Sequence, residues 1–348
     1  MGDASGPIGG APPLPPAAGV GYKAANVQTW ERSAMTLPKY KSVTRTQVAN
    51  QALKDGLVKP VGFEFDWVEV DPLIAAFRRM VRGNEFDICE LAITTYLCAK
   101  AYGKKFTAIP VFIVRQFHHG AILVNKNAGI RSPKDLEGKR VGVNRGYTVT
   151  TGVWARGILQ DQYGVDLSKV TWVLSGDEHV AEYKAPANVT PIEAGKKMED
   201  MLVSGELAAA IGVSVDHPDI APLIPDAEET GFAALKATGH YPINHLVVIR
   251  DELLEAHPGL ATEAFNAFAR SKQIYVDKLK AGEIELKGDA KMHKRVMEIT
   301  GGDPMPYGIE PNRGVVENLI GHAKKQGILS GSERIEDLFV KETLGLVG

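Results

Sequence analysis

The sequence predicts an α/β protein of two lobes joined by a hinge of two crossing strands. Strand-like alternation and helical spacing of apolar residues follow each other twice within residues 62–102. Both expected helices stop at a glycine, Gly83 and Gly103. Such a βαβα order builds a parallel sheet whose strand ends open on a ligand crevice. With 348 residues, the chain is too long for one compact core and suits two lobes.

The first lobe is expected to begin with four strands and two helices. Strands are expected over 62–71 and 85–90, helices over 72–83 and 91–102, and two further strands over 106–114 and 119–125. The last of these strands leads to a first crossing near Asn125.

The second lobe follows, and the chain then returns. A helical turn is expected at 132–138, strands at 139–144, 170–174 and 207–211, and helices at 148–164 and 194–204. The strand-like run 242–249 brings the chain back near Pro242, and helices over 258–279 and 312–326 complete the first lobe. The predicted boundaries are residues 36–125 and 243–348 for lobe 1, and 126–242 for lobe 2.

Composition excludes several classes of protein. A net charge of −2 and the lack of a lysine- and arginine-rich run argue against a nucleic-acid surface. No apolar stretch approaches 18 residues, so no membrane span is expected. Hydrophobic content of 44% and charged content of 24% are typical of a soluble globular protein.

The first 35 residues and the cysteines bear on the compartment. Residues 1–35 are expected to form a disordered leader, because residues 1–21 are rich in Gly, Pro and Ala. That stretch lacks the basic start and the apolar core of about 7–15 residues that a secretory signal needs. Cys89 and Cys98 provide no disulfide or metal framework, so both are expected to be free core thiols. A cytoplasmic location is expected.

Six segments resemble a known family. They are residues 84–97, 117–125, 135–143, 153–159, 163–166 and 241–250. Together they are similar to the 4,5-dihydroxyphthalate decarboxylase branch of the type II periplasmic-binding-protein-like proteins, from about Pro38 to Glu342. The chain departs from the family pattern at Thr44–Thr46, at His118–Gly120 and at Asn144–Thr148, all positions where a ligand is expected.

The resemblance implies a type II periplasmic-binding-protein-like fold and a carboxy-lyase of phthalate and aromatic catabolism. The implied substrate is a dihydroxylated aromatic dicarboxylate, 4,5-dihydroxyphthalate or a close analogue, which would give a protocatechuate-type product. It implies no cofactor, and it leaves a homo-oligomer open. The reaction needs an acid, a base and groups that hold the second carboxylate, because the ring carbon must be protonated as carbon dioxide leaves.

Three residues are expected to be catalytic. His119 is expected to act as acid or base, from the resemblance and its place before the first crossing. On a strand its neighbour His118 would point to the opposite face, so only one ring is expected in the cleft. Glu90 and His245 are expected to handle hydroxyl protons. Alternatively, Glu90 is a helix-start charge and His245 a buried histidine bonded to backbone.

The expected substrate-binding residues lie at strand ends and helix starts, where free amides favour anions. They are Arg115, Thr94 and Thr95 in lobe 1, and Arg145, Tyr147, Thr148, Thr150, Thr151 and Trp154 in lobe 2. Helix capping by Thr148 or Thr150 is an equal alternative, and Trp154 either stacks on a ring or belongs to the core.

A metal site is not expected. The clusters Asp177-Glu178-His179 and Asp216-His217-Pro218-Asp219 lack the ligand spacing of known metal motifs. Two other functions stay open beside the decarboxylase. One is a non-catalytic solute receptor for an aromatic or dicarboxylate ligand. The other is a cofactor-synthesis enzyme on the same scaffold, which no motif favours.

Overall fold

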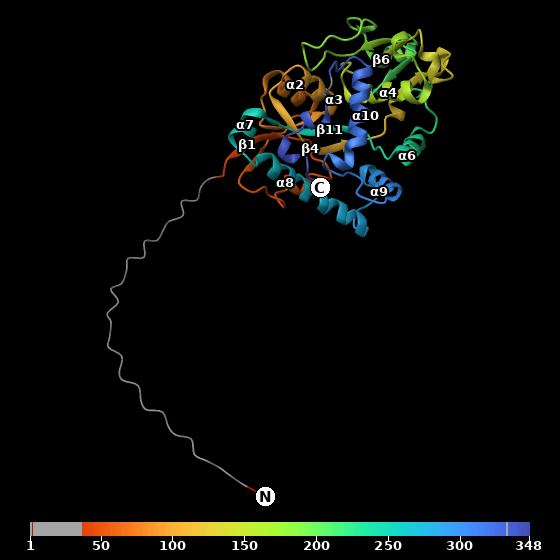
Figure 1. Cartoon of the computed structure of the whole chain (residues 1–348). Helices are drawn as coiled ribbons and strands as arrows, with labels where there is room; N and C mark the ends of the chain where they lie inside the picture. Colours follow the sequence, from red (N-terminus) through yellow and green to blue (C-terminus); the bar gives the residue numbers. More distant parts are fainter. Residues whose placement is uncertain (1, 3–36, 332) are drawn as a thin grey trace. The chain divides into compact units, whose positions relative to one another are not determined.

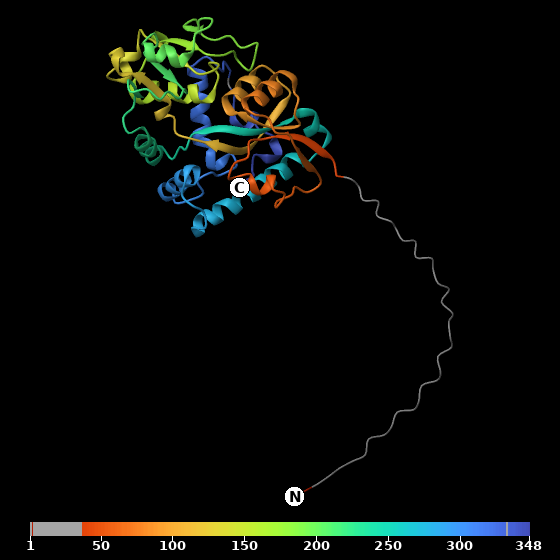
Figure 2. The same ribbon diagram turned by 180° about the vertical axis from the view of Figure 1, so that it is seen from behind.

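The computed structural model describes residue 2 and residues 37–331 and 333–348. The expected leader, apart from residue 2, lies outside the described residues. In the described part the chain forms two mixed β-sheets with helices around them (Figures 1 and 2). The α/β fold predicted from the sequence is therefore confirmed.

The first sheet has the strand order β2-β1-β3-β11-β4. Its strands are β1 (Lys39–Val43), β2 (Glu64–Trp67), β3 (Ile88–Ala92), β4 (Phe106–Arg115) and β11 (Ile243–Arg250). β1 runs parallel to β2 and β3, whereas β11 is antiparallel to both β3 and β4. The carboxyl ends of β1, β3 and β4 consequently meet the start of β11 at one edge, where open α/β sheets bind ligands.

The second sheet has the strand order β10-β5-β9-β6-β7-β8. Its strands are β5 (Ile122–Asn125), β6 (Arg140–Val143), β7 (Thr171–Leu174), β8 (Val189–Pro191), β9 (Ala209–Ile211) and β10 (Ile220–Pro222). β5 pairs antiparallel with β9 and β10, so it belongs to this sheet. The first crossing thus lies between Arg115 and Ile122, ahead of Asn125, because the alternation of residues 119–125 does not reveal which sheet the strand joins.

Ten helices are found in the described residues. They are α1 (Gln51–Lys54), α2 (Ile74–Gly83), α3 (Ile93–Ala101), α4 (Thr150–Tyr163), α5 (Met198–Ser204), α6 (Ala227–Thr238), α7 (Asp251–Ala256), α8 (Leu260–Ala281), α9 (Gly288–Thr300) and α10 (Arg313–Lys325). The local signals set their ends: α2 stops where Asn84 adopts a left-handed backbone, and α4 stops at Gly164 with a φ of 64°.

Burial follows the expected pattern. Leu246, Val247 and Val248 of β11 are fully buried, as expected for a strand in the interior of a sheet covered on both faces. Cys89 and Cys98 are free and buried, as predicted. In the part of the chain that the structure describes, no helix is both long and apolar enough to cross a membrane.

Candidate active site

A carboxylate and an imidazole meet at the carboxyl edge of the first sheet. Glu90 on β3 lies opposite Val247 of β11 in the antiparallel ladder. His245, two residues before Val247, therefore projects from the same face and lies diagonal to Glu90. Its Nδ1 is 2.6 Å from Oε1 of Glu90. The structure thus brings together two of the three residues expected to be catalytic.

The Glu90 carboxylate is buried and held on several sides. Its side chain has no exposed surface. Oε2 accepts the backbone N–H of Arg45 at 2.9 Å, and the side-chain amide of Gln47 lies 3.5 Å from both oxygens. Such contacts fix the carboxylate, which in turn fixes the imidazole ring of His245.

His245 keeps one ring nitrogen available. Because a carboxylate only accepts hydrogen bonds, Nδ1 carries the proton, and Nε2 holds the lone pair in the neutral ring. Nε2 makes no hydrogen bond to the described residues, and the side chain is 21% exposed. The ring of Phe77 packs edge-on against it at 5.1 Å. An imidazole oriented by a carboxylate, with its second nitrogen free, is an arrangement suited to proton transfer.

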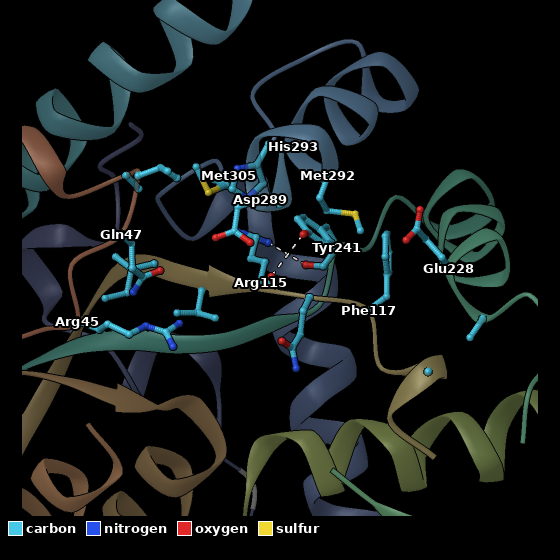
Figure 3. Close-up of a pocket in the computed structure, with 18 residues that line it drawn as sticks. Arg45, Gln47, Arg115, Phe117, Glu228, Tyr241, Asp289, Met292, His293 and Met305 are labelled. Carbon is cyan, nitrogen blue, oxygen red and sulfur yellow. Dashed lines mark hydrogen bonds between the residues drawn. The ribbon is translucent and has the colours of Figure 1, made fainter. Parts of the chain in front are cut away.

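Residues that hold Glu90 also line a cavity of about 470 Å³, whose lining includes neither Glu90 nor His245 (Figure 3). Arg45 and Gln47, which contact Glu90, line it, and so does Val114, the cross-strand partner of His245. Small-molecule sites commonly have volumes of about 300–1,000 Å³. The other lining residues are Val48, Ala49, Ile113, Arg115, Gln116, Phe117, Gly120, Ala227, Glu228, Tyr241, Gly288, Asp289, Met292, His293 and Met305.

Arg115 forms part of the cavity wall but is itself buried. Its guanidinium donates to the carbonyl oxygens of Tyr241 at 2.9 Å and Pro306 at 3.0 Å, and to the side-chain oxygen of Asn312. Burial lowers the pKa of Arg115 to about 10. No carboxylate of the described chain lies within ion-pair distance.

Comparisons with known proteins identify the family. A relative from Comamonas testosteroni named 4,5-dihydroxyphthalate decarboxylase is 30% identical over 304 residues, which are 82% of this chain and 92% of the relative. A second relative of that name, from Pseudomonas putida, is 36% identical over 190 residues, covering 51% of this chain and 73% of the relative. The chain belongs to the 4,5-dihydroxyphthalate decarboxylase family. The resemblance drawn from the sequence segments is confirmed.

Other comparisons concern the scaffold. Residues 35–188 match the family model described as ABC transporter, phosphonate, periplasmic substrate-binding protein. A solved protein from Candida albicans, with the generic periplasmic binding protein fold, superimposes with a TM-score of 0.49 at 14% identity, covering 90% of this chain and 99% of that one. A sulfonate-binding protein from Methylobacillus flagellatus gives a TM-score of 0.48 at 11% identity, covering 87% and 91%.

The threonines at the starts of α3 and α4 are hydrogen-bonded to each other. The Thr94 hydroxyl donates to the carbonyl of Thr148 at 2.6 Å and lies 2.8 Å from the hydroxyl of Thr150. The Thr94 backbone N–H also points to the Thr150 hydroxyl, at 3.3 Å. No side-chain cap is formed at α3 or α4, so the expected capping alternative is not what these residues do.

The expected carboxylate cradle before α4 holds the chain's own carboxylate. Glu178 accepts the backbone N–H groups of Tyr147 and Thr148, and the Thr148 hydroxyl donates to it at 2.6 Å. An added Cβ at Gly146 would lie 2.6 Å from Glu178, so only glycine leaves room for this contact. These donors are therefore already satisfied.

The remaining predicted binding residues are dispersed. Arg145 is exposed, with a φ of 72° and no ion pair among the described residues. The Thr95 hydroxyl lies 3.5 Å from Nδ1 of His179. Thr151 is half-buried beside Gly212. Trp154 is buried and donates its indole N–H to the carbonyl of Ile243 at 2.9 Å, which places it in the core at the hinge.

The tandem histidines occupy a turn instead of the expected strand. His118 precedes a 3-10 turn that covers His119–Ala121, so the argument from alternating strand faces does not apply to them. His119 bonds Gln162 at 3.0 Å and lines a separate cavity of about 250 Å³, whose lining includes neither Arg45 nor Gln47, the residues that contact Glu90. His118 is buried against Asn244 at 3.0 Å, and burial lowers its pKa to about 4.

The acidic clusters have other partners. Asp177 pairs with Arg78 at 2.5 Å and with Arg82 at 2.8 Å. Nδ1 of His217 accepts the backbone N–H of Asp219 at 3.2 Å. Across the described ranges, no group of three or more His, Cys, Asp or Glu side chains is placed to hold a metal ion.

Several cavity residues were not predicted as site residues. Arg45 lies in the Thr44–Thr46 departure from the family pattern, which was the one available signal. Gln47, Asp289 and His293 line the same cavity but belong to loops or to a helix outside the segments that resemble the family.

Proposed function

We propose that the protein decarboxylates 4,5-dihydroxyphthalate or a close analogue to a protocatechuate-type catechol acid. The observation that carries the proposal is the Glu90–His245 pair, in which Glu90 is buried and Nε2 of His245 has no partner in the described chain. Arg45 and Gln47, which contact Glu90, line a cavity of suitable size. The two relatives named 4,5-dihydroxyphthalate decarboxylase support the same reaction. The ligand class is an aromatic diacid, and no cofactor enters the scheme.

We assign His245 to the proton that replaces carbon dioxide. The arginines in the cavity wall, Arg45 and Arg115, attract the carboxylate edge of a diacid. In our proposal the carbon that loses its carboxylate faces His245. Protonated His245 donates the Nε2 proton to that ring carbon. The carbon–carbon bond then breaks, its electron pair returns to the ring, and carbon dioxide leaves. Neutral His245 regains a proton from water, so one proton is consumed for each carbon dioxide released.

Glu90 positions the ring through Nδ1 and provides the counter-charge while His245 is protonated. A hydroxyl para to the leaving carboxylate supports protonation of the ring carbon, because it donates electrons there when its proton is shared with a base. General acid–base assistance of this kind contributes about 10²–10⁴-fold.

The experiment is steady-state turnover of the purified protein with 4,5-dihydroxyphthalate, followed by carbon dioxide release and by protocatechuate formation. We expect turnover in the natural protein and a loss of about 10²–10⁴-fold in His245→Gln. Equal rates in both proteins would refute the assignment of His245.

A solute receptor is the second candidate, and the match of residues 35–188 to a periplasmic substrate-binding family favours it. A receptor would bind the diacid without releasing carbon dioxide. A cytoplasmic location is part of our proposal, and the free buried thiols Cys89 and Cys98 support it. Cell fractionation tests this, and recovery in the periplasm would favour the receptor.

A further inference from the structure

The cavity of about 470 Å³ is lined by side chains of both charges (Figure 3). Arg45 follows β1 and Arg115 ends β4, so both cations come from the sheet. Asp289 lies in the first turn of α9 and Glu228 in the first turn of α6, so both carboxylates come from the helices. Glu228 is 3.8 Å from Arg295, whereas Asp289 has no ion-pair partner in the described chain.

Neither cation has a counter-ion in the described chain. The exposed side chain of Arg45 makes no hydrogen bond or ion pair with the described residues. Arg115 is bound only by neutral oxygens, and its buried Nε has no partner there. A buried charge without a counter-ion is costly, so an anion that enters the cavity offsets this cost.

The cavity wall also contains apolar side chains. They are those of Val48, Ile113, Phe117, Met292 and Met305. An aromatic ring suits such walls, since ligand sites combine apolar surface with a few placed polar groups. A dihydroxylated aromatic diacid carries groups that suit both charges of the cavity, because its carboxylates suit the cations and its hydroxyls, on the opposite edge of the ring, can donate to a carboxylate.

We infer that the cavity orients the diacid, with its carboxylates toward Arg45 and Arg115 and its hydroxyl edge toward Asp289. Asp289 is then the residue that selects dihydroxylated rings, because its carboxylate accepts a hydrogen bond from a ring hydroxyl. The choice of diacid rests on the proposed function. During turnover Asp289 takes the proton of the hydroxyl para to the leaving carboxylate and returns it after carbon dioxide has left.

Two ligands that the proposed reaction does not convert are used: phthalate, which lacks hydroxyls, and protocatechuate, which has them. Comparing their affinities distinguishes recognition of the carboxylates from recognition of the hydroxyls. Calorimetry measures their affinities for the natural protein and for single variants. Asp289→Asn should weaken protocatechuate by about 10-fold and leave phthalate unchanged or tighter. Arg45→Gln should weaken phthalate by about 10-fold and protocatechuate by less, because one carboxylate remains.

Two further variants complete the design. Ala227→Phe narrows the cavity from its rim and should weaken both ligands. Arg131→Gln is the matched control for Arg45→Gln, since Arg131 is also exposed and without an ion pair in the described residues, and it should change neither affinity. Arg115 is left in place because it holds three oxygens of the fold.

Equal effects of Asp289→Asn on both ligands would overturn the inference. Unchanged affinities for both ligands in Arg45→Gln and in Ala227→Phe would also overturn it. A third contradicting result is that Arg145→Gln, and not Arg45→Gln, weakens phthalate binding. If the affinities change as expected but the natural protein releases no carbon dioxide, the orientation stands and the proposed function fails. If the protein decarboxylates while these variants bind and turn over normally, the function stands and the orientation fails.

Discussion

The Glu90–His245 pair makes a quantitative prediction through three variants, Glu90→Gln, His245→Ala and the double variant. Glu90 is buried. Its carboxylate lies 2.6 Å from Nδ1 of His245 and accepts the backbone N–H of Arg45 at 2.9 Å. His245→Ala removes the imidazole ring and leaves the buried Glu90 carboxylate without this partner. Losing one partner of a buried pair costs about 3–5 kcal/mol, and we expect about 3 kcal/mol because the ring is partly exposed.

Glu90→Gln should cost less, about 1 kcal/mol, because the new amide oxygen still accepts the N–H of Arg45. The double variant leaves no buried charge without a partner. We therefore expect a loss of about 1 kcal/mol for the double variant, against about 4 kcal/mol if the two losses were additive. The coupling free energy of the pair is then about 3 kcal/mol.

Urea unfolding followed by circular dichroism measures the four free energies of unfolding, and turnover is measured on the same samples. Glu90→Gln should lower turnover by about 10²–10⁴-fold, because an amide N–H directed at Nδ1 selects the tautomer in which Nε2 cannot accept a proton. The double variant should be no slower than the slower single variant, since the two residues act as one unit. Glu178→Gln is the matched control: it alters another carboxylate that is held by backbone N–H groups but lies apart from Glu90, and turnover should change little.

Additive free energies of unfolding would show that the two side chains do not interact in solution. Turnover near that of the natural protein in Glu90→Gln would refute the role of the carboxylate in positioning His245.

Three further predictions follow from the structure. Burial lowers the pKa of His118, His179 and His293 to about 4, against about 6.5 in the unfolded chain. The unfolded chain therefore binds more protons than the folded chain between these pH values. The free energy of unfolding should fall as pH drops from about 6.5 to about 4 and should stay level above about pH 6.5. Urea unfolding midpoints measured across this range test the prediction. His119→Ala should lower turnover far less than His245→Gln does, because His119 lines a cavity apart from Glu90 and the residues that contact it; parallel rate measurements decide between the two histidines. Prolonged treatment with a chelator should leave turnover unchanged, and recovery of a lost rate on adding a divalent ion would contradict the acid–base scheme.

Local signals in the sequence were sufficient for most elements. The helix from Ile74 to Gly83 and the strand that begins at Ile243 lie within one or two residues of their expected positions, because periodicity and glycine stops are local. The strand from Ile122 to Asn125 was recognised but placed in the other lobe. Its pairing with β9 depends on residues more than 80 positions away, which no local pattern encodes.

The site was predictable only in part, for the same reason. Glu90 and His245 were each expected to be catalytic, yet their contact spans 155 residues and depends on the β3–β11 register. The cradle at Tyr147 and Thr148 was expected to hold a ligand, and Glu178 fills it through another long-range contact. Asp289 reaches the cavity from the first turn of a helix and shows no signal in the sequence.

Turnover of 4,5-dihydroxyphthalate in heavy water tests the central claim most directly, with the product examined by proton magnetic resonance. We predict that the natural protein releases carbon dioxide and forms protocatechuate with one deuterium on the carbon that lost its carboxylate, and that His245→Gln forms it far more slowly. Unchanged substrate, recovered with the natural protein although calorimetry shows that it binds, would contradict the account and identify the protein as a receptor.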